Sequence, residues 1–286
     1  MEKPSLAQMF IVLLVWVAMT QADLQEKLFP ACRKFLYMST LPQGLQGPPL
    51  ELICQYYNGK ARFVTLYDTL HRIPVYSAYT FKRSDGSRKV DVPWMYEPQL
   101  SIAMGSRDMQ QFPQRDLHRS SEDAQAVLDD YQDTVDVVRG QLNPDKHQNE
   151  YDDKAATYTL TNVVMQIKEF SVGPWAAHEE VTRQRLNNYC LGTAYMVTGA
   201  LTSGKVIRRH NADRVAVPEY MWSAYCCDDY DCNAPYYEFS RFPAFASLGR
   251  NRKLDNKVQE TSVQQLEEFI KSLTGKTFTI FHNNCK

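Results

Sequence analysis

The sequence predicts an α+β fold, with a central, mainly antiparallel β-sheet flanked by helices. Three observations favour this class. Segments rich in β-branched and aromatic residues follow one another with only short turns between them, which is typical of hairpins. Other segments have a helical composition, and one of them carries a helix-capping box. Strands and helices do not alternate regularly, so a parallel sheet built from βαβ units is not expected.

The clearest strands lie in the first third of the chain. Residues 61–67 (ARFVTLY) and 73–81 (IPVYSAYTF) are rich in β-branched and aromatic side chains. The residues between them are few enough for a turn, so the two segments predict a hairpin or meander. Further strands are predicted at residues 158–164, 195–201 and 222–225.

Three segments are predicted to be helical. Residues 122–131 have the composition of a surface helix, and residues 176–189 that of a long helix. Near the C-terminal end, Ser262 and Gln265 form a capping box. Apolar residues at helical spacing follow it, which predicts an amphipathic closing helix. These apolar residues are Val263, Leu266, Ile270 and Leu273.

The first residues predict a secretory signal peptide. Lys3 supplies a positive charge, residues 9–18 are almost wholly apolar, and small residues precede Asp23. We therefore expect residues 1–22 to be removed, leaving a single domain of residues 23–286 that is secreted and extracellular. The apolar run is about half of the roughly twenty residues that cross a bilayer. An uncleaved anchor is the weaker alternative, and no membrane attachment is expected after cleavage.

All seven cysteines follow the predicted cleavage point, and secretion makes disulfides their expected state. The odd number leaves one thiol free or paired with another chain. Cys226, Cys227 and Cys232 enclose three aspartates, which permits a disulfide-closed surface loop or a metal site. We favour the loop, because no histidine lies close by in the sequence to complete a zinc site.

The formal net charge is −1 at pH 7, so bulk charge does not indicate a nucleic-acid binder. Binding to nucleic acid would need a local basic patch. Two clusters are candidates, and we favour the simpler interpretation that each is a solvated surface loop. One consists of Lys205, Arg208, Arg209 and His210, and the other of Arg250, Arg252 and Lys253.

The chemistry of the chain is indicated by several short blocks. Residues 138–144 read VRGQLNP, residues 160–162 read LTN and residues 170–171 read FS; Trp175 and Glu179 follow. In this order they resemble the D/E-R-G-H-L-N-P, L-T-N, F-N and W-x-x-x-E blocks of the DNA/RNA non-specific endonucleases. Three further segments resemble the endonuclease-domain-containing-1-like branch of secreted vertebrate proteins: residues 72–79, 94–100 and 221–227.

The resemblance implies the ββα-metal fold and metal-dependent hydrolysis of phosphodiester bonds in DNA or RNA. Such hydrolysis needs a base that activates water and a cation that stabilises the charge on the phosphoryl oxygens. In the family, the His of R-G-H is the base, the Asn of F-N binds Mg²⁺, and the Glu of W-x-x-x-E holds a water on the metal. The resemblance thus implies site roles for Arg139 and Asn162 on the phosphate and for Glu179 near the metal. Arg88 lies near a position where the family often carries another phosphate-contacting arginine.

Two of these positions depart from the family's pattern. Gln141 replaces the base, and a carboxamide cannot take up a proton near neutral pH. Ser171 replaces the metal ligand, and its short neutral hydroxyl would reach Mg²⁺ poorly. Val138 stands where an acidic residue could orient Arg139. A general base typically contributes about 10²–10⁴-fold to the rate, so we expect hydrolysis to be lost or very weak.

Three functions remain open. The leading hypothesis is a secreted pseudonuclease that binds DNA, RNA or an unidentified protein partner. The second is an active Mg²⁺-dependent endonuclease with a rearranged site, in which His147 or His178 substitutes for the base. The third is a secreted protein-interaction module without a nucleic-acid role, which the near-neutral charge mildly favours. Trp175 is expected to pack the helix against the sheet, and Asn162 could equally hold a strand end in place.

Overall fold

The computed structural model describes most of the chain. The described residues are 30–86, 90–102, 104–113, 117, 119–132 and 135–285. The predicted signal peptide, residues 1–22, and Arg88 therefore lie outside the described residues. Within the described part, the chain contains no helix that is long and apolar enough to cross a membrane.

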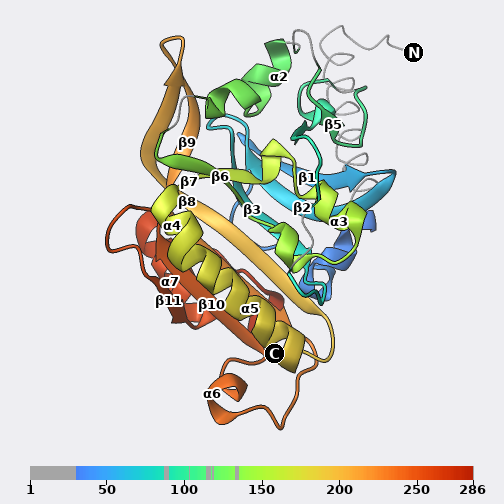
Figure 1. The fold of residues 1–286 in the computed structure, drawn as a ribbon, viewed down its shortest axis with the longest axis vertical. Helices are drawn as coiled ribbons and strands as arrows, with labels where there is room; N and C mark the ends of the chain where they lie inside the picture. The colour runs from blue at the N-terminus through green and yellow to red at the C-terminus, as the bar shows by residue number, and fades with distance from the viewer. Residues whose placement is uncertain are drawn as a thin grey trace, which may run out of the picture.

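A seven-stranded antiparallel sheet forms the centre of the fold (Figure 1), in the order β1-β2-β3-β8-β9-β10-β11. Helices pack against it, so the predicted α+β class is confirmed. The strands of this sheet are β1 (Leu50–Tyr57), β2 (Lys60–Asp68), β3 (Ile73–Thr80), β8 (Ala194–Arg209), β9 (Ala212–Cys227), β10 (Ala244–Arg250) and β11 (Val258–Thr261).

The strands predicted for this sheet are confirmed, although two of them are longer than expected. The hairpin predicted at residues 61–67 and 73–81 corresponds to β2 and β3, which pair antiparallel. The strands predicted at residues 195–201 and 222–225 are parts of β8 and β9, which form a ribbon of two 16-residue strands. The far half of β8 is mostly exposed and polar, so it lacks the composition that predicts a strand.

Side chains of the central strands alternate between two apolar cores. Along β9, Trp222 and Ala224 belong to the core that includes buried residues of α7 (Val263–Thr274). Tyr225 belongs to a second core, which includes Leu186 of α5 (Ala176–Tyr189). Figure 1 shows α5 in front of the sheet and α7 behind it. Successive strand residues point to opposite faces, so both faces of the central strands are covered.

This alternation determines the disulfide pairing. Adjacent Cys226 and Cys227 lie in different cores. They pair with Cys285 and Cys190, so neither closes a loop with Cys232. The predicted disulfide-closed loop is therefore wrong. Cys232 is exposed and unpaired within the chain, which agrees with the expected odd thiol. The disulfides are Cys32–Cys54, Cys190–Cys227 and Cys226–Cys285.

The predicted helix at residues 122–131 is wrong in extent and in exposure. The chain forms α2 (Arg119–Ala124) and then a separate 3-10 turn at Leu128–Tyr131. Asp130 ends any continuous helix, because its carboxylate accepts a hydrogen bond from the backbone N–H of Val127 at 2.9 Å. Asp130 itself is buried, so this segment is not a surface helix.

The strand predicted at residues 158–164 begins five residues late. Residues Leu160–Asn162 form a 3-10 turn, and β7 runs from Val163 to Ile167. The other two predicted helices are confirmed. Residues 176–189 match α5, and the capping box of Ser262 and Gln265 starts α7. Leu273 on α7 is exposed, however.

A smaller unit beside the main sheet carries the positions of the endonuclease-like blocks. β6 (Val137–Gln141) pairs antiparallel with β7, and α5 follows after a turn at Ser171–Trp175. This strand–strand–helix order is the ββα arrangement that the resemblance predicts. The remaining short elements are α3 (Tyr151–Ala156), α4 (Lys168–Phe170), α6 (Tyr236–Phe239), β4 (Met95–Tyr96) and β5 (Gln110–Gln111).

Candidate functional site

The ββα unit surrounds a cavity of about 220 Å³, which we call the central cavity. Four of the predicted site residues line it, namely Arg139, Gln141, Ser171 and Glu179. They come from β6, from the turn before α5 and from α5 itself. The other lining residues are Trp94, Gly140, Pro144, Asp145, Lys146, Tyr158, Gln166 and Trp175.

Arg139 brings to this cavity a positive charge that forms no direct ion pair with the described residues. Its guanidinium carbon lies 4.9 Å from the ring centre of Trp94 and 6.0 Å from that of Tyr131. No carboxylate of the described residues pairs with it, and position 138 is a valine. Burial lowers the pKa of Arg139, but an arginine keeps its charge in proteins. Aromatic rings therefore hold this cation in place of a carboxylate.

Gln141 at the base position is engaged at both ends of its amide. Its Nε2 donates to the carbonyl oxygen of Thr157 at 3.0 Å and to the Thr157 hydroxyl at 2.9 Å. Its Oε1 accepts from the backbone N–H of Asp145 at 3.3 Å. The side chain thus braces the loop after β6, and it has no site at which it could take up a proton.

Asn162 lies behind the cavity wall and does not line it. Its Nδ2 donates to the carbonyl oxygens of Asn143 at 3.0 Å and Thr157 at 2.9 Å. Its Oδ1 accepts from the backbone N–H of Asn143 and the hydroxyl of Ser77, both at 2.9 Å. The residue is fully buried. Of its two predicted roles, this geometry favours the one that holds the backbone in position.

Gln166 reaches the central cavity because position 140 is a glycine. A Cβ atom at Gly140 would overlap the Gln166 carboxamide. Gln166 is 1% exposed, and its Nε2 has no hydrogen-bond partner among the described residues. A buried donor without a partner costs free energy unless a ligand or water accepts from it. The cavity wall therefore offers a donor to an electron-rich group.

The positions expected to hold Mg²⁺ do not fit that ion well. Ser171 offers only a neutral hydroxyl. Burial raises the pKa of the Glu179 carboxyl to about 7, although the nearby positive charge of Lys146 opposes the rise. Within the described residues, no group of three or more His, Cys, Asp or Glu side chains could hold a metal ion.

The two histidines considered as substitute bases do not line the central cavity. His147 is 3% exposed, with Nδ1 3.0 Å from the Tyr79 hydroxyl and Nε2 3.2 Å from the carbonyl oxygen of Glu179. Burial lowers its pKa to about 4. Burial also lowers the pKa of His178 to about 3, and its ring packs 5.1 Å from that of Trp175. Trp175 is buried in the core between helix and sheet, as predicted.

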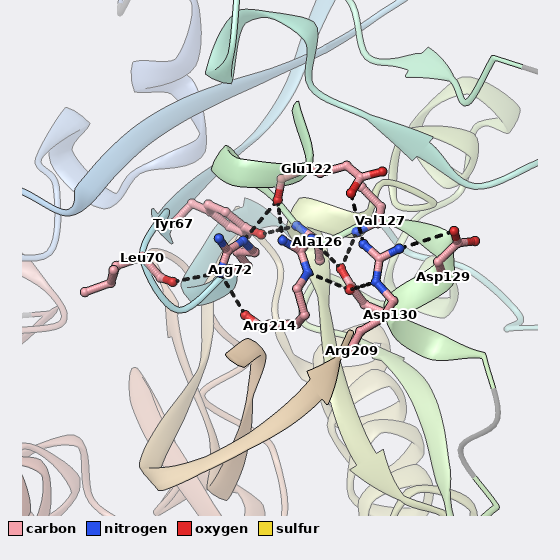
Figure 2. A network of polar contacts seen from close by, with 10 residues as sticks. All are labelled: Tyr67, Leu70, Arg72, Glu122, Ala126, Val127, Asp129, Asp130, Arg209 and Arg214. Atoms are coloured by element: carbon pink, nitrogen blue, oxygen red, sulfur yellow. Dashed lines mark hydrogen bonds and ion pairs between the residues drawn. The ribbon is translucent and has the colours of Figure 1, made fainter. Parts of the chain in front are cut away.

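Salt bridges neutralise most of the two basic clusters noted in the sequence. The interpretation of the first cluster as a solvated surface loop is wrong, because Lys205, Arg208 and Arg209 lie on β8 and the Arg209 side chain is only 18% exposed. Figure 2 shows Arg209 joined to acidic residues of α2 and of the segment that follows it. The pairs are Arg208–Asp213, Arg209–Glu122, Arg209–Asp129, Arg209–Asp130, Arg250–Glu219, Arg252–Asp255 and Lys253–Glu169.

The comparisons with known proteins agree with this geometry. A model of the DNA/RNA non-specific endonuclease family matches residues 50–285, so the chain belongs to that family. It is 32% identical over 218 residues to the Endonuclease domain-containing 1 protein of Homo sapiens, which covers 71% of this chain and 40% of the human protein. The Mus musculus protein of that name is 31% identical over 232 residues, which covers 75% of this chain and 43% of the mouse protein. The chain thus spans less than half the length of these relatives.

A solved structure with a similar fold comes from the EndoG/EndoGI complex, whose title refers to the mechanism of EndoG inhibition. The TM-score is 0.49 at 16% identity, over 75% of this chain and 82% of that chain.

Proposed function

We propose that this chain is a pseudonuclease, which binds the phosphate backbone of nucleic acid in the central cavity and does not cleave it. One observation carries the proposal. The central cavity keeps Arg139 without a carboxylate partner, while the base position is a Gln141 amide that is bonded at both ends. The site thus retains a group that attracts phosphate and lacks one that activates water.

Binding would use the donors that line the cavity. The planar guanidinium of Arg139 can donate two parallel hydrogen bonds to phosphate oxygens. Lys146 adds a second cation as a point charge, and the Nε2 of Gln166 adds a neutral donor. Trp94 and Tyr131 keep the Arg139 guanidinium oriented, so less freedom is lost when a ligand binds.

Cleavage would lack its usual base. Loss of a positioned base typically costs about 10²–10⁴ in rate, which is roughly 3–5 kcal/mol of activation free energy. His147 cannot replace it from where it lies, because both of its ring nitrogens face groups inside the protein. Since the residues around Ser171 do not fit Mg²⁺, we derive no step through a metal.

We also propose that the chain acts outside the cell as one domain of residues 23–286, after removal of residues 1–22. The three disulfides support this proposal, because such bonds persist in oxidising compartments. N-terminal sequencing of the protein secreted by cultured cells tests it. An N-terminus at Asp23 is expected, and retention in the cell with residues 1–22 attached would contradict the proposal.

Cleavage assays test the loss of hydrolysis. Plasmid DNA and RNA are incubated with the native protein and with a Gln141→His, Ser171→Asn double variant, in Mg²⁺ or Mn²⁺ and beside an EDTA control. We expect no cleavage by the native protein and EDTA-sensitive cleavage by the double variant. Cleavage by the native protein that EDTA abolishes would show an active nuclease instead.

Binding assays test the retained half of the proposal. Fluorescence anisotropy with a labelled single-stranded oligonucleotide should show salt-dependent binding, which Arg139→Gln weakens by about tenfold. Arg250→Gln is the matched control, because Arg250 is salt-bridged to Glu219. Absence of binding, or binding that does not depend on salt, would favour a protein-interaction module.

A further inference from the structure

A second cavity shares a wall with the central cavity. It has a volume of about 660 Å³, and we call it the Arg83 cavity. Asp145 and Lys146 line the central cavity, and residues of the Arg83 cavity bond to their backbone. The Ser84 hydroxyl donates to the carbonyl oxygen of Lys146 at 2.7 Å, and the Lys154 ammonium donates to that of Asp145 at 3.2 Å. The lining residues are Arg83, Ser84, Asp85, Asn149, Lys154 and Asn187.

Two cations line this cavity. The Arg83 guanidinium donates to the carbonyl oxygen of Cys190 and pairs with no carboxylate of the described residues. Lys154 is 1% exposed, and its ammonium donates to the carbonyl oxygen of Asp145 at 3.2 Å. Asp85 is the one carboxylate among the lining residues, and it interacts electrostatically with the nearby Arg183. The lining residues thus include two cations and one carboxylate.

The walls of the Arg83 cavity are anchored to α5. Asn187 on this helix donates from Nδ2 to the carbonyl oxygen of Ser84 at 2.7 Å. The Arg183 guanidinium donates to the same carbonyl oxygen and is itself held by Glu180. The backbone beside Arg83 thus keeps its place without a ligand, so little ordering would be needed on binding.

We propose that the Arg83 cavity binds a further phosphate of a nucleic-acid strand that has another phosphate in the central cavity. The inference rests on the proposed function, because the phosphate in the central cavity orients the strand. Arg83 would donate to the phosphate oxygens, Lys154 would add a point charge, and the exposed Asn149 amide would contact the sugar. The strand would cross the Asp145–Lys146 turn between the two cavities, so the ligand class is a single strand of at least two phosphates.

The test compares a long and a short ligand on the full chain. Anisotropy is measured with a labelled 12-nucleotide single strand over a range of salt concentrations, and a dinucleotide with one phosphodiester serves as competitor. Arg83→Gln should weaken 12-mer binding about tenfold and reduce the log–log salt slope by about 0.7. The inhibition constant of the dinucleotide should stay unchanged. Arg83→Lys, which keeps the charge, should retain the slope.

The remaining variants separate this inference from the proposed function. Arg139→Gln should weaken both ligands, and Arg250→Gln should affect neither. If Arg139→Gln weakens the 12-mer while Arg83→Gln leaves its affinity and salt slope unchanged, the Arg83 cavity is not a subsite and the proposed function stands. If Arg139→Gln has no effect on either ligand, both proposals fail. Equal melting temperatures of the native protein and the Arg83 variants confirm that they are folded.

Discussion

The central cavity and the ion-pair network around Asp130 differ in whether their arginines have carboxylate partners. In the cavity, Arg139 faces two aromatic rings and has no carboxylate partner among the described residues. In the network, the side chain of Asp130 is wholly buried, and two arginines contact it. We define the Asp130 network as Arg72, Glu122, Asp130, Arg209 and Arg214 (Figure 2).

In the Asp130 network, both carboxylates are paired with arginines. Arg214 binds the Asp130 carboxylate with two parallel hydrogen bonds, of 2.8 Å to Oδ1 and 3.0 Å to Oδ2. Arg209 adds an ion pair at 3.1 Å, and Arg72 donates to backbone carbonyl oxygens. These bonds connect the β8–β9 ribbon to the segment that contains α2. Saturated arginines of this kind hold elements together and have little capacity left for a ligand.

The contrast shows why counting basic residues in the sequence misleads. The cluster around Arg209 has a high local density of positive charge, yet nearby carboxylates neutralise most of it. Arg139 stands alone in its segment, yet its charge is unmatched. Availability for a phosphate therefore depends on the partners that the fold supplies.

The largest expected effect is on the stability of the Asp130 network. Arg214→Met would remove the bidentate partner of a buried carboxylate, and Arg209 would compensate only in part. We expect the free energy of unfolding to fall by about 3 kcal/mol, measured by urea denaturation with the disulfides intact. Nucleic-acid affinity should change little.

The control for this prediction is Arg250→Met. The side chain of Arg250 is 42% exposed and its salt bridge to Glu219 lies at the surface, so its loss should cost about 1 kcal/mol or less. If the two substitutions cost the same, burial would not distinguish the Asp130 network from an ordinary surface pair.

Much of the fold was predictable because its signals are local. The hairpin of β2 and β3, helix α5 and the capping box of α7 all appear as composition or spacing within a few residues. The segment around Asp130 was mispredicted because its partners are distant in sequence. Arg214 lies 84 residues further along the chain, and no local pattern shows that Asp130 is buried against it.

The site residues likewise fall into those that local sequence signals could predict and those that they could not. Gln141 and Ser171 could be found because each stands inside a short block of known order. Lys146, Trp94 and Gln166 were missed as site residues, because only the folded chain brings them to the same cavity. A partial signal existed for Lys146, which lies five residues after Gln141. The role of Gly140 in admitting Gln166 depends on the pairing of β6 with β7.

The second prediction concerns Glu97, a buried carboxyl whose hydrogen-bond partners are neutral hydroxyls. Glu97 is 4% exposed and accepts hydrogen bonds from the hydroxyls of Thr159 and Thr161. Burial raises its pKa to about 8, and the negative charge of Asp108 adds to the rise. Because the folded protein favours the protonated carboxyl, its stabilising contribution is complete below the pKa of the unfolded chain, near 4.5. This contribution is lost as the pH rises through 8.

Glu97→Gln should remove this loss. The variant should match the native protein near pH 4.5 and exceed its free energy of unfolding at pH 8.5 by roughly 1–3 kcal/mol. Urea denaturation at several pH values measures the difference. Both proteins should carry Cys232→Ser, because an exposed thiol can exchange with disulfides at alkaline pH. If the free energies of unfolding of the two proteins depend on pH in the same way, Glu97 is ionised in the folded protein. Its charge would then be compensated, as that of Asp130 is by arginines.

The smallest expected effect on the free energy of unfolding is at Arg139 in the central cavity. Arg139→Met should change the free energy of unfolding by no more than about 0.5 kcal/mol in either direction. The substitution forfeits a cation–π contact worth about 0.5–1 kcal/mol, but it also removes a partly buried charge and leaves an apolar side chain beside Trp94 and Tyr131. Urea denaturation measures the change. A cost as large as that of Arg214→Met would mean that Arg139 serves the fold, and its unmatched charge would no longer support a role on a ligand.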